Sequence, residues 1–275
     1  MYQKPTAPRS IGGVLDDTLQ LYKASFSSCW LPSLLITVIS AGLSYYMLAS
    51  MPPTPVGQLR FMDILARYST LGLAFYVWYV VVILAGLVFY GMLFLNIAAV
   101  ARGETPAFGT SMAKAIRRAP ALFGASIVFT VAVGVATCLL IIPGIYVMNR
   151  LWLYMVPLEV EPQGPLVSLG TSWRLVSGNW WRTASVVTVL FVILVVLEIV
   201  LTSLAGIVAL LIGGLPSDAT HLAAKVSAAS LLIGGFVRIF TTPIVCAVLV
   251  ALYHDLSLRK GGGDLETRLG ALPQT

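Results

Sequence analysis

The chain has 275 residues, of which 58% are hydrophobic and only 10% are charged, and its formal net charge at pH 7 is +6. Soluble domains carry about 25% charged residues, so this composition excludes a water-soluble globular domain and predicts an integral membrane protein. The excess of cations does not predict nucleic-acid binding, because no cluster of Lys and Arg alternates with aromatic residues on a polar face. In a membrane protein such an excess is typical of cytoplasmic loops.

Six apolar stretches divide the chain. A helix that crosses a bilayer core of about 30 Å needs roughly 20 residues. The stretches lie at residues 30–50, 71–101, 121–142, 144–158, 183–212 and 226–253. We therefore predict an all-α membrane protein with one integral membrane domain over residues 1–275. It consists of a cytoplasmic amphipathic segment at 1–29, a six-helix bundle at 30–254 and a cytoplasmic tail at 255–275.

The third and fourth stretches flank Pro143 and Gly144. A continuous helix from 121 to 158 would be about 57 Å long at 1.5 Å per residue, nearly twice the thickness of the hydrocarbon core. The Pro-Gly pair is a strong turn signal, because proline presets φ and glycine tolerates positive φ. Length and turn signal together predict a hairpin that turns at Pro143–Gly144, and hence six crossings.

The distribution of cations tests this topology independently. With a cytoplasmic N-terminus and six crossings, most Lys and Arg residues fall in inside segments, whereas the outside loops hold Arg60, Arg67 and Lys225. A single crossing in place of the hairpin would move the basic 159–182 loop outside. The positive-inside rule therefore supports the hairpin and predicts that both termini lie on the cytoplasmic side of the inner membrane. Arg150 then lies close enough to the outer surface to act as an anchor there.

A short amphipathic segment precedes the first, third and fifth crossings. In the first segment, residues 10–26, one face carries Ile11, Val14, Leu15, Leu19, Tyr22 and Phe26, and the other carries Asp16, Asp17, Gln20 and Lys23. The other two segments, around 110–122 and 164–181, carry the side chains that we expect to contact lipid or a partner: Lys114, Arg117, Arg118, Trp173, Arg174, Trp180 and Trp181. Each segment has the pattern of a helix in the cytoplasmic interface, and its cations favour anionic lipid. Either the chain repeats a unit of interfacial helix plus hairpin, or amphipathic turns simply precede the spans without a repeat.

Two ionisable residues lie deep in the predicted membrane. Glu198 is about 15 residues into the fifth crossing and Arg238 about 12 residues into the sixth, which runs the other way, so both lie near the bilayer centre. A charge there costs at least ~2.5–3.5 kcal/mol on insertion scales, and such residues therefore face the interior and pair. We predict a Glu198–Arg238 ion pair, which either clamps the last two helices or forms a polar site on a permeation path.

Sequence motifs for catalysis and cofactor binding are absent. The chain contains no G-x-x-x-x-G-K-[ST] phosphate loop, no H-E-x-x-H and no G-x-S-x-G. Cys29, Cys138 and Cys246 lie far apart within apolar stretches and match no zinc or redox spacing. We expect neither enzyme activity nor a cofactor or bound metal.

Four stretches are informative together: RSIGGVLDDTLQLYKASF, IPGIYVMNRLWLYMVPLEVE, SLGTSWRLVSGNWWR and YHDLSLRKGGGDLE. This pattern resembles the membrane domain attached to some glycerophosphoryl diester phosphodiesterases and the related YciC-like bacterial integral membrane proteins. The resemblance covers nearly the whole chain. Its most specific parts are Pro143–Gly144 with Arg150, the SWRL element at 172–175 and the YHDL element at 253–256. It implies a six-helix inner-membrane domain without an established activity, since the phosphodiesterase reaction belongs to a separate soluble barrel for which this chain has no room.

Two functions remain open. The first is a non-catalytic scaffold or accessory module that binds partner proteins or anionic lipid at the cytoplasmic face. The second is a small transporter or channel with a polar site at the level of Glu198 and Arg238. We favour the module, because only two buried charges are predicted and they neutralise each other. The sequence indicates neither a particular partner nor an oligomeric state.

Overall fold

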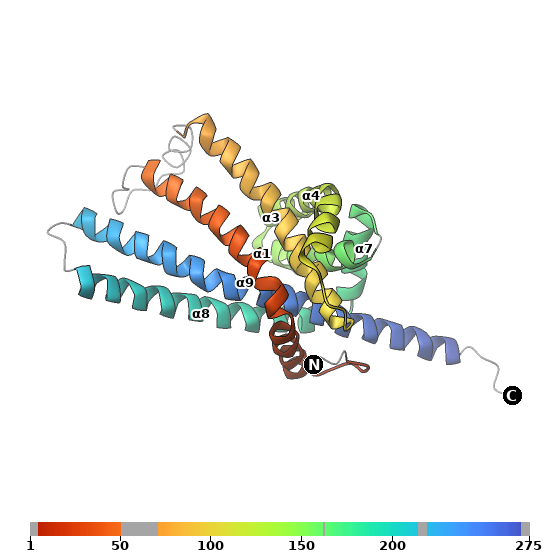
Figure 1. The fold of residues 1–275 in the computed structure, drawn as a ribbon. Helices are drawn as coiled ribbons and strands as arrows, with labels where there is room; N and C mark the ends of the chain where they lie inside the picture. Colours follow the sequence, from red (N-terminus) through yellow and green to blue (C-terminus); the bar gives the residue numbers. More distant parts are fainter. Residues whose placement is uncertain (1–4, 51–70, 162, 214–218, 271–275) are drawn as a thin grey trace. The chain divides into compact units, whose positions relative to one another are not determined.

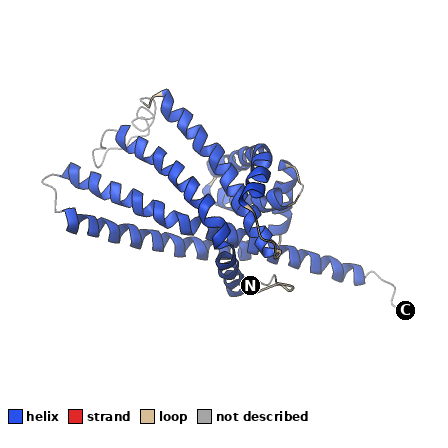
Figure 2. Cartoon of the chain, in the orientation of Figure 1, coloured by secondary structure: helices blue, strands red, loops and turns tan. Residues whose placement is uncertain are grey.

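The computed structural model describes residues 5–50, 71–161, 163–213 and 219–270, and all regular structure in these ranges is helical (Figure 2). The helices are α1 (Ile11–Ser50), α3 (Leu73–Ala101), α4 (Phe108–Leu139), α5 (Ile141–Leu151), the 3₁₀ helix η1 (Trp152–Tyr154), α6 (Met155–Val160), α7 (Pro165–Val176), α8 (Trp180–Gly213) and α9 (Ala219–Gly270). Helices suit long apolar runs because each helix satisfies its own backbone hydrogen bonds. The predicted all-α class is confirmed for this part of the chain.

In the described part of the chain, six helical segments are long and apolar enough to cross a membrane. They are Ile11–Met47, Leu73–Ala101, Phe108–Leu139, Ile141–Val160, Trp180–Val208 and Leu232–Gly261. Their number agrees with the six predicted crossings. Large apolar side chains such as Leu73, Phe191 and Leu211 stay exposed on α3 and α8, as expected for surfaces that face lipid.

The helices pack as two compact units. The first unit comprises Met1–Pro32, Leu87–Val192 and Thr242–Thr275, and the second comprises Ser33–Gly86 and Ile193–Thr241. The first therefore holds all of α4 to α7 together with one end of α1, α3, α8 and α9. The second holds the other ends of those four long helices.

The core of the first unit is built around α9. Cys246 to Leu252 of α9 are buried, and they belong to one cluster with Leu21 of α1, Phe94 of α3 and Val186 of α8. A second cluster joins α4 to the segment after it through Leu122, Ala125, Leu151, Tyr154, Leu158 and Leu169. Both clusters lie in the first unit, so this unit contains most of the buried side chains that the structure describes.

The second unit is held by small and aromatic residues. Leu43, Leu71 and Phe75 form its apolar cluster, and the Phe75 ring stacks on Tyr46. The halves of α8 and α9 in this unit run side by side (Figure 1), and Gly234 of α9 lies against Glu198 and Thr202 of α8. Close approach at a glycine fits the small-residue packing predicted for these helices.

The predicted hairpin forms, but its turn lies three residues before Pro143. α4 and α5 are separated at Leu140, whose backbone is extended with φ −161° and ψ 147°. Pro143 falls in the first turn of α5, where no N–H donor is needed. Gly144 serves close packing, since a Cβ there would lie 2.2 Å from Oγ1 and 2.9 Å from Cα of Thr137. The sequence therefore predicted the hairpin correctly but placed its turn at the wrong residues.

Two of the three predicted interfacial segments are not separate helices. Residues 10–26 run directly into α1 and residues 110–122 into α4, and only α7 stands alone. On α1 the predicted faces are also partly wrong, because Asp17 is buried whereas Leu19 is half exposed. Arg9 supplies a cation 3.7 Å from the buried Asp17 carboxylate. That these segments lie in a membrane interface stays a prediction, and Arg60 and Arg67 of the predicted outside loop lie outside the described residues.

Gly144→Ala tests the close contact in the hairpin. The added methyl group would overlap Thr137, so we expect the free energy of unfolding to fall by about 1–3 kcal/mol. Gly134→Ala in the adjacent helix is the matched control, because nothing lies within 4 Å of a Cβ there. It should leave stability unchanged or raise it by up to about 1 kcal/mol through helix propensity. Unfolding of both variants in one detergent checks this, and equal effects would contradict the contact.

Candidate functional site

A buried carboxylate in α9 joins three parts of the first unit: the segment before α1, the start of α8 and α9 itself. Asp255 of α9 is only 5% exposed. Its Oδ2 accepts hydrogen bonds from Nε of Arg182 and from Nε of Arg259, both at 3.0 Å, and its Oδ1 accepts one from the backbone N–H of Arg9 at 2.8 Å. Two guanidinium groups and one peptide thus compensate a charge that burial would otherwise penalise.

The same cations fix the segment that precedes α1. The carbonyl oxygen of Arg9 accepts a hydrogen bond from Nη2 of Arg259 at 2.7 Å and another from Nη2 of Arg182. The Arg9 side chain lies 3.7 Å from Asp17. Both backbone groups of Arg9 are therefore held, and the residues just before it are positioned against α8 and α9.

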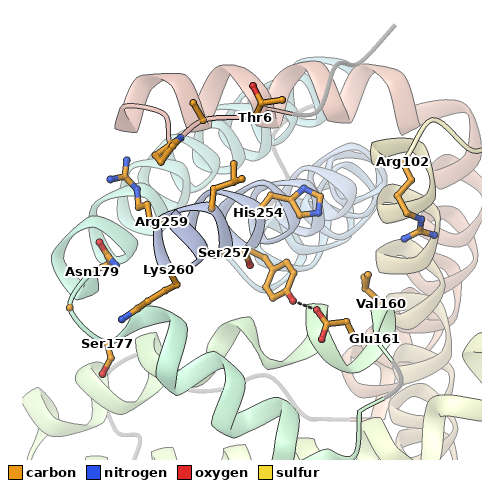
Figure 3. Close-up of a pocket in the computed structure, with 16 residues that line it drawn as sticks. Thr6, Arg102, Val160, Glu161, Ser177, Asn179, His254, Ser257, Arg259 and Lys260 are labelled. Carbon is orange, nitrogen blue, oxygen red and sulfur yellow. Dashed lines mark hydrogen bonds between the residues drawn. The ribbon is translucent and has the colours of Figure 1, made fainter. Parts of the chain in front are cut away.

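A pocket lined by both polar and apolar groups opens beside this network, with a volume of about 1080 Å³ (Figure 3). Its walls come from the segment before α1, the end of α3, the end of α6, the turn between α7 and α8, and α9. The lining residues are Thr6, Ala7, Pro8, Arg102, Val160, Glu161, Ser177, Gly178, Asn179, Tyr253, His254, Ser257, Leu258, Arg259, Lys260 and Gly261. All of them belong to the first unit.

A smaller cavity adjoins the pocket. It has a volume of about 490 Å³ and shares Glu161, Tyr253, Ser257 and Lys260 with the pocket. It adds Arg174 of α7, one of the residues that the sequence predicted to contact lipid or a partner. Lys260 and Arg174 are both exposed, and neither forms an ion pair with a described residue.

Glu161 lies between the two cavities and is fully engaged. Its Oε1 accepts a hydrogen bond from the Tyr253 hydroxyl, and its Oε2 accepts one from the Gln163 amide. Arg118 donates from Nη1 to the carbonyl oxygen of Leu158 at 2.9 Å and also to those of Glu159 and Glu161. Arg118 therefore caps the end of α6, and its contact with lipid or a partner stays a prediction.

Glu159, in contrast to Glu161, is a buried carboxylate whose oxygens accept no hydrogen bond from the described residues. Its side chain is 1% exposed, and neither carboxylate oxygen has a hydrogen-bond partner in the described part of the chain. It packs against α3, where a Cβ at Gly91 would lie 2.9 Å from its Oε1. A buried carboxylate without partners destabilises a fold, so this residue is a weak point of the first unit.

The contacts of Arg150 show that the sequence-based placement of Arg150 and Trp173 on opposite membrane surfaces is wrong. We expected Arg150 near the outer surface and Trp173 near the cytoplasmic surface. The Arg150 guanidinium carbon lies 4.4 Å from the centre of the Trp173 ring and 4.7 Å from that of Tyr146, so they cannot occupy opposite surfaces. The reason is that α7 folds back along α5, as the hydrogen bond from Ser172 Oγ to the Arg150 carbonyl oxygen at 2.7 Å shows. Arg150 is an anchor, but through cation–π contacts.

The remaining predicted contact residues are mostly exposed. Lys114 and Arg117 lie on the exposed face of the first turns of α4. Trp181 is 79% exposed at the start of α8, whereas Trp180 stacks on Tyr146 and donates a hydrogen bond to its carbonyl oxygen at 3.4 Å. Lys114, Arg117 and Trp181 therefore remain available for lipid or a partner.

Glu198 and Arg238 both lie in the second unit. The Glu198 carboxylate approaches α9 at Gly234, one helical turn before Arg238. None of the ion pairs within 4.0 Å among the described residues joins Glu198 to Arg238. The pairing of these two charges stays a prediction.

An exposed ion pair closes the loop after α3. Arg102 donates to Glu104 from Nε at 2.8 Å and from Nη2 at 3.2 Å. The hydrogen bonds and charge of Arg102 hold the pKa of Glu104 below its ordinary value, so Glu104 is ionised at neutral pH. Among the described residues, no group of three or more His, Cys, Asp or Glu side chains could hold a metal ion.

Reasoning from the sequence alone did not identify the residues that form the Asp255 network and most of the pocket. Asp255, Arg182 and Glu161 look like ordinary polar residues at the ends of apolar stretches. A usable signal was present, because all of them fall in the stretches RSIGGVLDD, YMVPLEVE, SGNWWR and YHDLSLRK that carried the resemblance to a known family. Comparisons of the chain with family models, curated proteins and solved structures found no match, so that resemblance stays a prediction.

Asp255→Asn tests the role of the buried carboxylate. The amide cannot neutralise Arg182 and Arg259, so we expect the free energy of unfolding to fall by roughly 3 kcal/mol. Proteases should also cut the segment around Arg9 more rapidly, because Arg182 and Arg259, which bind the Arg9 carbonyl oxygen, lose the carboxylate that positions them. Asp16→Asn makes the same change at an exposed position and should alter neither readout. Unchanged proteolysis of Asp255→Asn would contradict the network.

Glu159→Leu and Glu161→Leu form a matched pair two residues apart. Glu159→Leu removes a carboxylate without partners, and we expect it to raise the free energy of unfolding by about 1–3 kcal/mol. Glu161→Leu leaves Tyr253 and Gln163 without their acceptor and should lower it by a similar amount. Chemical unfolding in detergent measures both changes. If Glu159→Leu is the more damaging of the two, the assignment of hydrogen bonds is wrong.

Proposed function

We propose that this protein is a non-catalytic, multi-pass inner-membrane module that binds anionic lipid or a partner protein at its cytoplasmic face. The observation that carries the proposal is the exposure of cations and tryptophan in the first unit. Lys114 and Arg117 are exposed on α4, Arg174 on α7 and Trp181 at the start of α8. Exposed Lys and Arg together with Trp are typical of side chains at headgroup depth.

Apolar neighbours support the same interpretation. Phe108 and Ile116 are exposed on the same first turns of α4 as Lys114 and Arg117, and Leu166 and Val167 are exposed on α7. An exposed cation beside an exposed apolar side chain suits the boundary between headgroups and acyl chains. The apolar groups would enter the boundary while the cations contact lipid phosphates.

The binding energy expected from these cations is modest. Each Lys or Arg near an anionic membrane surface contributes about 1 kcal/mol, and this attraction falls off within a Debye length. Such a contribution adjusts which lipids or acidic partners surround the protein. It is small beside the energy that holds six apolar helices in the bilayer, which accords with a module that recruits neighbours.

Lys114→Gln with Arg117→Gln tests the proposal. We compare thermal unfolding in nanodiscs of phosphatidylcholine alone with nanodiscs that also contain phosphatidylglycerol. Ligands that bind only the folded state stabilise it, so the wild type should be more stable with phosphatidylglycerol. The double variant should lose about 1 kcal/mol of that gain for each cation removed.

Gln20→Ala is the control, because Gln20 is an exposed and uncharged residue on α1, so the change leaves every cation in place. It should keep most of the stabilisation by phosphatidylglycerol. A wild type that is equally stable in both nanodiscs would refute lipid binding. If the wild type instead captures one protein in mild detergent and the double variant does not, the result supports binding of a partner protein.

A further inference from the structure

We propose that the cavities on either side of Lys260 form a binding site for a phosphate group, carried by an anionic lipid headgroup or by a small soluble phosphate. This inference rests on the proposed function for its lipid form, because an anionic headgroup would be met at the same face. The argument comes from four properties of the described residues: available cations, the balance of charge, the turn before α8 and the size of the space.

The first property is that two cations at the site are available. Arg259 is occupied by Asp255 and Arg9, and Arg102 is occupied by Glu104. Lys260 and Arg174 have no hydrogen-bond or ion-pair partner among the described residues, and both are exposed. Lys260 lines both cavities and Arg174 lines the smaller one. Two cations that have no anionic partner among the described residues attract an anionic ligand.

The second property is the lack of a competing anion. Glu161 is the single carboxylate among the described residues that line the two cavities. Both of its oxygens already accept hydrogen bonds, from Tyr253 and Gln163. The charge of Glu161 is thus directed toward its own partners, and the two positive charges of Lys260 and Arg174 outnumber it around the space.

The third property is the turn between α7 and α8. Gly178 adopts a positive φ of 83°, and the Asn179 carbonyl oxygen accepts the Thr183 N–H at 3.0 Å, so α8 begins at the pocket wall. In Figure 3 the Lys260 side chain extends toward this turn, where Ser177 and Asn179 are labelled. The first N–H groups of a long helix carry partial positive charge and bind phosphate oxygens, adding to the cations.

The fourth property is size. The pocket of about 1080 Å³ and the cavity of about 490 Å³ exceed what one phosphate fills, so room remains beside it. Thr6, Ser257 and Asn179 line that room and offer hydrogen bonds to hydroxyl groups. A phosphate esterified to a small alcohol, as in a glycerophospholipid headgroup, fits in this room.

The experiment uses the full chain in a neutral detergent. The unfolding temperature is titrated with inorganic phosphate and, separately, with short-chain phosphatidic acid, each against chloride at equal ionic strength. We expect saturable stabilisation, with an apparent Kd that rises about tenfold or more in Lys260→Gln and in Arg174→Gln, because each removes one charge-assisted contact. Both residues are exposed, so neither change should impair folding.

Lys114→Gln with Arg117→Gln is the control and should leave the affinity for inorganic phosphate unchanged. Binding of both probes with competition between them supports a site that accepts free phosphate. Binding of phosphatidic acid alone, still weakened by Lys260→Gln, supports a lipid headgroup site. Absence of binding by both probes, or binding that neither Lys260→Gln nor Arg174→Gln weakens, overturns the inference. Since these arms need no bilayer, the result is separate from the nanodisc test of the proposed function.

Discussion

The first unit depends on the neutralisation of one buried carboxylate. Asp255 lies among the apolar residues of α9, and a lone charge there would be costly. Two arginines and one backbone N–H satisfy it, and the arginines in turn hold the carbonyl oxygen of Arg9. These groups come from the segment before α1, from α8 and from α9. The hydrogen bonds to the Asp255 carboxylate therefore hold three parts of the chain together. The segment before α1, α8 and α9 are held together in this way beside the pocket.

Some polar side chains next to this network have hydrogen-bond partners and others do not. This difference separates residues that stabilise the fold from residues that are candidates for binding a ligand. Arg118 donates a hydrogen bond to a backbone carbonyl oxygen of α6, and Glu161 accepts hydrogen bonds from Tyr253 and Gln163. Both residues therefore stabilise the end of α6. Glu159 is buried without hydrogen-bond partners among the described residues, and it lowers stability. Lys260 and Arg174 are exposed beside a cavity. Exposed cations can exchange water for a ligand at little cost, which makes them the better candidates for binding.

Some of the fold could be predicted from the sequence and some could not. The hairpin of α4 and α5 followed from length, because 38 residues from 121 to 158 are too many for one crossing. The turn position did not follow, since proline is equally suited to the first turn of a helix and to the turn itself. Arg150 was assigned to a membrane surface from its distance along the chain. Its contact with Trp173 depends on α7 folding back, which no local pattern encodes.

The sequence by itself determined that this chain forms long apolar helices and how many of them can cross a membrane. Composition and length suffice for that, because a helix in lipid must satisfy its own backbone hydrogen bonds and needs no distant partner. Only the tertiary structure decided which polar residues pair and which stay available. Arg9 and Asp255 are 246 positions apart, and their hydrogen bond exists because packing of α1, α8 and α9 brings them together. Side-chain pairing across such separations depends on three-dimensional proximity, and among the described residues it leaves Lys260 and Arg174 without an ion-pair partner.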